Sequence, residues 1–319
     1  MKRAYFLWSL AVLLLCAGLV ALSPMRAAAA YPDRTITMII PFGAGGATDV
    51  IGRYIALHLG KKLGQTIIVK NIAGSGGVIG MTELAESRPD GYTIGFSPVA
   101  PLIMQPNFRK TMYNLSSFCS IARATNEPLF LEVSAQSPIQ DMKGLLETVK
   151  KAPDKFFWGH LGMGSQIHLS MAHMFKMMGV NPRAIVFKDD AEAMAALISG
   201  RIMLYDSLPS LPARYGVRAI AALSEERYPQ LNVSTAREQG YDLRYTQWMS
   251  LVGPKGIPQE RLAVLERAFA EVCADSEYIK DIATVHSVPA YLNSKDNQAF
   301  MEREEAYYKR AMDEILKTQ

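Results

Sequence analysis

The stretch ITMIIPFGAGGATDVIGRYIALHLGKKL, residues 36–63, decides the fold. It begins with an apolar run, continues through the glycine-rich residues 43–46, and then repeats apolar side chains at every fourth position. This pattern predicts a strand, a loop and a helix. Thr48 is the expected N-cap of the helix, and Asp49 falls in its first turn. Because the loop is poor in side chains and opens a helix, its backbone N–H groups are suited to holding an anion.

The first thirty residues have the composition of a targeting segment. They begin with Lys2 and Arg3, continue through an apolar run and end in four alanines. This order is typical of a secretory signal peptide, so we expect residues 1–30 to be cleaved and the protein to be periplasmic. An uncleaved membrane anchor is the alternative. A lipoprotein at Cys16 is disfavoured, because Leu15 stands where a small residue is needed.

The remaining residues are close to neutral. The chain of 319 residues has a formal net charge of +4, and Lys2, Arg3 and Arg26 supply three of these charges. Nucleic acid and anionic membranes are therefore not indicated as partners. Cys119 and Cys273 either form a disulfide or stay as isolated apolar residues.

A second strand, loop and helix follow at residues 66–70, 71–77 and 78–86, with Gly74, Ser75, Gly76 and Gly77 in the loop. Alternating strands and helices indicate an α/β domain with a largely parallel sheet. Ligands of such sheets bind beyond the carboxyl ends of the strands, where both glycine loops are expected.

The pattern occurs a third time in the second half of the chain. A strand at 156–161 leads to Gly164, Ser165 and Gln166 at the start of a helix. Ser165 either caps this helix or donates to a ligand. Lys188, after a strand at 184–187, either neutralises an anion or is solvated. Asp206, at the end of the extended segment IMLYDS (202–207), holds either a ligand amino group or a loop.

Extended segments near residues 130 and 248 divide the chain. They predict two α/β lobes, residues 31–130 plus 247–319 and residues 131–246, joined by two crossover strands and preceded by the signal peptide 1–30. Two lobes joined in this way enclose a cleft and can hinge about it.

Several short motifs together resemble the tripartite tricarboxylate transporter substrate-binding proteins, also called the Bug family. They are Pro41-Phe42, Gly45-Gly46, Asp49, Asn71, Gly74, Gly76-Gly77, Pro89-Asp90-Gly91-Tyr92-Thr93, Gly162, Gly164-Ser165, His168-Leu169, Trp248 and Gly253-Pro254. The resemblance implies a periplasmic solute-binding protein of the Venus flytrap, type II-like fold. It also implies carboxylate binding through backbone groups of the first two glycine loops and bridging waters, with the second lobe setting specificity.

The chain departs from the family pattern at three places. Gly43-Ala44 replaces a common Ala-Pro, Ile72-Ala73 replaces Arg-Pro, and Ile202-Met203 replaces Val-Asp. The first two substitutions keep the backbone donors of the loops but remove prolines that restrict them. The third removes a carboxylate near the second lobe, so the ligand of a typical member cannot be assigned to this chain.

These observations predict a monomeric receptor without enzymatic activity, metal or cofactor. It captures a small organic anion, a mono- or dicarboxylate, for a tripartite tricarboxylate-type transporter; a receptor for a sensor kinase is the alternative. A hydrolase built on Ser165 is disfavoured because the Gly-x-Ser-x-Gly motif is missing, and a dehydrogenase because the glycine spacing at 74–80 is one residue too long. The candidate ligand-binding residues are Phe42, Gly43, Ala44, Gly45, Gly46, Thr48, Asp49, Gly74, Ser75, Gly76, Gly77, Gly164, Ser165, Gln166, Lys188 and Asp206.

Overall fold

The computed structural model describes residues 31–228, 231–285, 287 and 289–316. The chain divides into two units, Met1–Asp33 and Arg34–Gln319, and the described helices and strands belong to the second. The predicted signal peptide lies outside the described residues. Among the described helices, none has the length and apolar character needed to cross a membrane.

The larger sheet has six strands in the order β11-β4-β10-β3-β1-β2. Their bounds are β1 Ile36–Ile40, β2 Ile67–Asn71, β3 Thr93–Pro98, β4 Phe118–Pro128, β10 Thr246–Pro254 and β11 Pro289–Leu292. β1 is parallel to β2 and β3, and its apolar run is almost entirely buried between them. β10 is antiparallel to β3 and β4. The sheet is therefore mixed, and not largely parallel as predicted, because β10 and β11 return to it from the second half of the chain.

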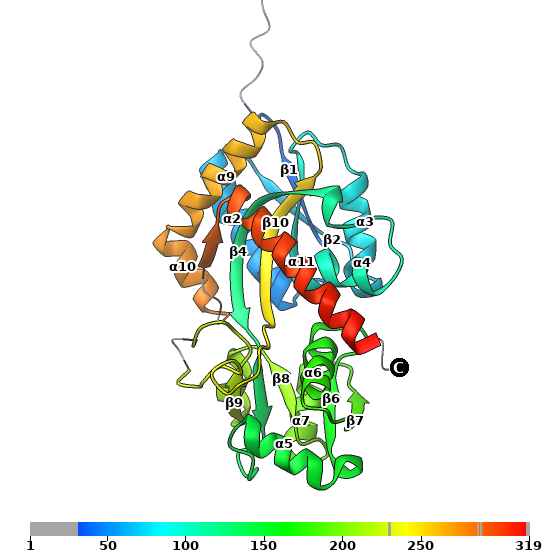
Figure 1. Cartoon of the computed structure of the whole chain (residues 1–319). Coiled ribbons are helices and arrows are strands. Elements are labelled where there is room, and N and C mark those ends of the chain that lie inside the picture. Colours follow the sequence, from blue (N-terminus) through cyan, green and yellow to red (C-terminus); the bar gives the residue numbers. More distant parts are fainter. Residues whose placement is uncertain (1–30, 229–230, 286, 288, 317–319) are drawn as a thin grey trace, which may run out of the picture. The chain divides into compact units, whose positions relative to one another are not determined.

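Helices cover this sheet on both sides (Figure 1). α2 (Ala47–Leu63) packs beside α9 (Gln259–Cys273) and α10 (Ser276–Ala283), while α3 (Val78–Glu86) lies toward the other side with the short α4 (Gln105–Phe108). Three short helical turns complete this part of the chain: η1 Ser75–Gly77, η2 Ala100–Met104 and η3 Leu115–Ser117. The two α/β units predicted at the start of the chain are present with nearly the predicted bounds.

The middle of the chain forms two smaller sheets. One has the order β8-β5-β9, and the other pairs β6 with β7 in parallel. The strands are β5 Phe130–Val133, β6 Phe157–His160, β7 Arg183–Val186, β8 Tyr205–Ser207 and β9 Arg218–Ala222; the helices are α5 Met142–Lys151, η4 Pro153–Lys155, α6 Gln166–Met177, α7 Asp190–Ile198 and α8 Ser210–Tyr215. A bridge between Trp158 and Leu204 links the two sheets.

Two chain segments join the larger sheet to the smaller ones. β4 continues through Leu129 into β5, and the chain returns through Tyr245 into β10. The backbone N–H of Leu129 donates to the carbonyl of Tyr245 at 3.0 Å, so the two crossovers lie side by side. We propose the lobe boundaries predicted from the sequence, with residues 31–130 plus 247–319 around the larger sheet and 131–246 around the smaller ones.

The long C-terminal helix α11 (Ser294–Leu316) contacts the larger sheet and helix α6 from the middle of the chain (Figure 1). It packs on β4, and its Tyr307 ring lies 6.2 Å from the His173 ring of α6. The His173 ring in turn shares a hydrogen bond of 3.0 Å with the hydroxyl of Tyr245 on the return crossover. These contacts join α11, α6 and the return crossover. The glycine loops border a separate cavity.

Candidate functional site

The first glycine loop joins β1 to α2, and a side chain of α2 holds it in place. α2 begins at Ala47, and its N-cap is Gly46, not Thr48 as predicted. The reason is that Asp49, one residue beyond Thr48, turns back to accept from the Gly45 N–H at 2.8 Å. Gly46 has no side chain with which to cap the first turn, so no side-chain cap covers the start of α2.

Asp49 is the centre of a buried polar cluster beneath this loop. Its side chain is only 2% exposed. It accepts from Arg53 Nε at 2.9 Å and from Asn71 Nδ2 at 2.8 Å, and the same Asn71 nitrogen donates to the Phe42 carbonyl at 3.0 Å. Burial opposes ionisation, but the bonds from Arg53, Gly45 and Asn71 outweigh it, so the pKa of Asp49 lies below its usual value. Asp49 therefore orders the loop as a carboxylate.

The second glycine loop has an unusual backbone. Gly74, Gly76 and Gly77 have positive φ angles, and Ser75 is the non-glycine residue with positive φ (51°) among the described residues. A Cβ on Gly76 would lie 3.0 Å from Gln105 Nε2 and 3.2 Å from an Arg109 nitrogen. Glycine is thus required here by the backbone conformation and by the close approach of α4 and the residue after it.

Arg109, directly after α4, clamps this loop. Its guanidinium donates to the Ser75 hydroxyl at 2.9 Å, to the Ser75 carbonyl at 2.8 Å and to Gln105 Oε1 at 2.7 Å. Ser75 accepts both bonds while its backbone is in the left-handed conformation. The clamp therefore offsets part of the cost of that backbone strain.

The third glycine loop leads into α6. Ser165 is the N-cap and accepts from the His168 N–H at 3.2 Å. Gln166 Nε2 donates to the Thr246 carbonyl at 2.9 Å, which fastens the start of α6 to the return crossover. Gly164 has φ 75°, and a Cβ there would lie 2.8 Å from the Phe108 ring. The third loop therefore meets α4 across the opening between the sheets.

The three loops border a cavity of about 770 Å³. The predicted residues that line it are Phe42, Gly43, Ala44, Gly46, Thr48, Gly76, Ser165 and Gln166. The other lining residues, which sequence reasoning did not single out, are Ala47, Pro98, Ala100, Gln105, Arg109, Leu161, Met163, Ile167 and Gln247. Arg109 is the only charged side chain among these described lining residues, so the wall of the cavity is positive.

A family comparison identifies the class of this protein. The sequence model described as tripartite tricarboxylate transporter family receptor matches residues 51–316. The chain belongs to this receptor family. A solute-binding protein of the same TctC type from Polaromonas superposes on the receptor with a TM-score of 0.80 at 30% identity, over 89% of this chain and 99% of its own. The family and the two-lobed periplasmic-binding-protein fold predicted from the sequence are both confirmed.

Two further solved structures resemble the receptor and carry ligands. MatC from Rhodopseudomonas palustris, with bound malate, has a TM-score of 0.72 at 26% identity, over 88% of this chain and 99% of its own. A second R. palustris protein, with adipate, has a TM-score of 0.74 at 25% identity, over 89% and 98%. The family to which the chain belongs is one of substrate-binding receptors and is not an enzyme family.

The structure does not bring all the predicted site residues of the receptor to the cavity. Those that do not line it are Gly45, Asp49, Gly74, Ser75, Gly77, Gly164, Lys188 and Asp206. Gly45, Gly74, Ser75, Gly77 and Gly164 belong to the three loops, and Asp49 of α2 holds the first loop through Gly45. Lys188 is exposed, and its backbone N–H donates to Glu192 at 3.1 Å. A direct ligand contact of these eight residues stays a prediction.

Asp206 lies in β8, one residue before the strand ends at Ser207, but it does not line the cavity. It is fully buried, and the hydroxyl of Ser170 on α6 donates to it. Its second oxygen has no hydrogen-bond partner among the described residues. Burial raises the pKa of Asp206 well above its usual value and so favours the neutral form of the side chain.

Two further cavities are lined by other parts of the described chain, and neither includes residues of the first two glycine loops. One, of about 460 Å³, mixes arginines with glutamates, including the ion pair of Arg244 with Glu225 at 2.8 Å. The other, of about 390 Å³, lies beside α6 and is lined largely by apolar side chains such as Trp158 and Phe175.

The sequence left two alternatives for Cys119 and Cys273, a disulfide or two isolated residues. In the structure both are free thiols.

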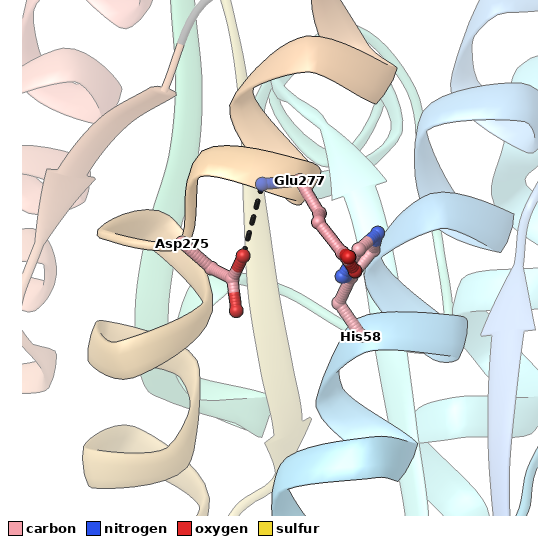
Figure 2. Close-up of side chains that lie close together, drawn as sticks. All are labelled: His58, Asp275 and Glu277. Atoms are coloured by element: carbon pink, nitrogen blue, oxygen red, sulfur yellow. Dashed lines mark hydrogen bonds between the residues drawn. The ribbon is translucent and has the colours of Figure 1, made fainter.

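His58, Asp275 and Glu277 form a cluster of possible metal ligands between α2 and α10 (Figure 2). One ligand atom of each lies within 4.8 Å of the others. The acids already have cationic partners, however, since Lys62 lies 3.3 Å from Asp275 and Lys61 lies 3.4 Å from Glu277. Figure 2 also shows Asp275 accepting from the Glu277 N–H, at 2.9 Å, as the N-cap of α10. We interpret the cluster as an ion-pair contact that joins two helices.

Proposed function

We propose that this receptor captures a small organic carboxylate in the 770 Å³ cavity and delivers it to a tripartite tricarboxylate-type transporter. The observation that carries this proposal is the charge of the wall. Arg109 is positive, the uncapped start of α2 lines the same cavity, and no acidic side chain is among the described lining residues. Both features favour an anion. Malate and adipate, which the two R. palustris proteins hold, are carboxylates.

Both sides of the cavity are needed for tight binding. A hydrogen bond to a charged group contributes about 1.5–3 kcal/mol, whereas association costs about 4–15 kcal/mol. The few donors of the first loop therefore fall short of micromolar affinity, about −8.2 kcal/mol. Ser165 and Gln166 line the opposite part of the same cavity and supply further contacts when the lobes close.

The contacts around Ser165 support a receptor without enzymatic activity. The His168 ring accepts from the Gly164 N–H at 3.3 Å through Nδ1, and its backbone N–H donates to the Ser165 hydroxyl. Asp206 is bonded to Ser170 instead of to the imidazole. Ser165, His168 and Asp206 thus lack the linked order of nucleophile, base and orienting acid that a hydrolase needs.

The proposed location is the periplasm, reached through cleavage of the signal peptide 1–30. Delivery to a transporter and docking on a sensor kinase remain the two possible uses of the captured solute. Both uses require the same ligand-binding cavity, and they differ only in the membrane partner. Affinity capture from membranes with ligand-loaded protein, analysed by mass spectrometry, distinguishes them, because a transporter subunit or a kinase is recovered.

The first experiment is native mass spectrometry of the mature protein, followed by thermal shift against mono- and dicarboxylates and their amides. A ligand that binds only the folded state raises the melting temperature. We expect a co-purified acid or a shift with acids and none with the matching amides. A protein that is empty and is not shifted by any acid would reject the carboxylate proposal.

A further inference from the structure

Arg109 is held as a rigid group at the cavity wall. Three of its five N–H groups are used in the bonds to Ser75 and Gln105. Because both terminal nitrogens and Nε are engaged, the guanidinium plane is fixed before any ligand arrives. A prearranged fork loses little freedom when it binds an anion.

The charge of Arg109 is not neutralised by the protein. Its three partners are an amide oxygen, a hydroxyl and a carbonyl, and the ion pairs among the described residues do not include it. Each terminal nitrogen makes one of these bonds and carries two hydrogens, so each keeps one N–H for another acceptor. A cation lining a cavity with donors to spare is suited to a carboxylate.

Arg109 and the first glycine loop are two separate anion-attracting groups in one cavity. The first loop offers the start of α2 at Gly46, Ala47 and Thr48. Arg109 comes from the end of α4, next to Phe108, whose ring packs against the third loop at Gly164. The two groups therefore belong to different elements, and one carboxylate on each is the simplest way to use both.

We propose that Arg109 binds a second anionic group of the ligand, so that the receptor selects dicarboxylates over monocarboxylates. This inference rests on the proposed function and assigns a residue to its specificity. The first loop holds one carboxylate and Arg109 holds the other. Arg109 faces solvent in the open cavity, so screening limits its effect to about tenfold in affinity.

The test separates this role from the clamp on Ser75. Calorimetry measures the affinity of the full mature protein for succinate and adipate and for their monoamides, succinamate and adipamate, which keep the length and remove one charge. The variants are Arg109→Gln, Arg109→Lys and, as matched control, Ser75→Ala, which removes one clamp acceptor and leaves the cation. Circular dichroism and urea unfolding check that each variant is folded.

We expect wild type to prefer at least one dicarboxylate over its monoamide by about tenfold, and Arg109→Gln to lose that preference while monoamide affinity changes less than threefold. Arg109→Lys should keep part of the preference, and Ser75→Ala most of it. If Arg109→Gln lost affinity equally for the diacid and its monoamide, Arg109 would act only by holding Ser75, and the inference would be overturned. Wild type that binds each diacid and its monoamide equally overturns the inference alone, whereas wild type that also binds no acid of the thermal-shift panel overturns the proposed function as well.

Discussion

The first turn of α2, beneath the first glycine loop, and strand β8 each contain a buried aspartate, and the two carboxyl groups have opposite pKa shifts. Asp49, 2% exposed, accepts from Gly45, Arg53 and Asn71, and these bonds keep its pKa low. Asp206, fully buried, accepts from Ser170 alone among the described residues, and burial keeps its pKa high. Burial alone therefore does not decide the charge of a carboxylate; the number of donors aimed at it does. The carboxylate of Asp49 orders the first glycine loop, whereas burial of Asp206 favours its neutral form.

Replacing Asp49 should have the largest effect. Asp49→Ala leaves the Gly45 N–H, the Arg53 guanidinium and the Asn71 amide without their shared acceptor, so the loop loses its order. We expect a loss of about 2–4 kcal/mol in the free energy of unfolding, measured by urea denaturation. Affinity for the acid found in the thermal-shift panel should fall at least tenfold in calorimetry. Unchanged affinity would show that other contacts hold the loop.

Asp49→Asn is the matched control and tests the charge. The pKa of Asp49 is lowered in the folded state, so its stabilising contribution is present above the unfolded value of about 3.9 and is lost as the pH falls below it. The deficit of Asp49→Asn relative to wild type should therefore shrink in urea titrations between pH 6 and pH 3. A deficit that is constant over this range would contradict an ionised Asp49.

Protonation of His168, beside the third glycine loop, should reduce the unfolding free energy at acid pH by an amount smaller than the loss in Asp49→Ala. Burial and the neighbouring His160 lower its pKa to about 4. The unfolded pKa is about 6.5, so protons favour the unfolded state, and stability falls as the pH drops from about 6.5 toward 4. We expect a loss of about 1–3 kcal/mol over this range, and a shallower slope in His168→Gln. Equal slopes for the two proteins would remove His168 as the cause.

Replacing Asp206 should change the pH dependence of the unfolding free energy in the opposite direction to replacing Asp49. The folded state retains a proton on Asp206 that the unfolded state releases above about pH 3.9, so wild-type stability falls as the pH rises above that value. Asp206→Asn cannot ionise, and we expect its stability relative to wild type to increase by about 1 kcal/mol or more between pH 4 and pH 8. Urea denaturation at the two pH values measures it. A relative stability that decreases with pH would mean that Asp206 is ionised in the core.

The same comparison shows which parts of the site the sequence could predict. The first loop is local: its strand, glycines and helix period are adjacent, so its position and its Asp49 followed from the pattern. The N-cap was wrong by two residues, because the Asp49 side chain reaches back to Gly45 and makes capping by Thr48 unnecessary. Local patterns locate an element well but do not settle which side chain satisfies its ends.

Long-range features could not be predicted in this way. Arg109 follows a short helix without apolar periodicity, and its contact with Ser75 spans 34 residues of chain. Asp206 was assigned to the cavity because it lies near a strand end, and β8 does end at Ser207. Its side chain nevertheless meets Ser170 of α6, because successive side chains of a strand point to opposite faces and the local pattern does not say which face meets α6. The positive φ of Ser75 would have been the earliest indication of a clamp, but it is visible only in the structure.

Replacing Lys188 should give the smallest change in ligand affinity. This variant tests whether a positive charge must line the cavity to attract the ligand. Lys188 is exposed and lies outside the described lining, whereas Arg109 is part of it. Screening at physiological ionic strength acts over about 8 Å, so a charge beyond the wall contributes little. Lys188→Gln and Arg109→Gln remove the same charge, yet we expect the first to change dicarboxylate affinity less than twofold and the second about tenfold. A loss of similar size in both variants, measured by calorimetry at low and physiological salt, would mean that the overall field of the protein attracts the anion and that the placement of Arg109 is unimportant.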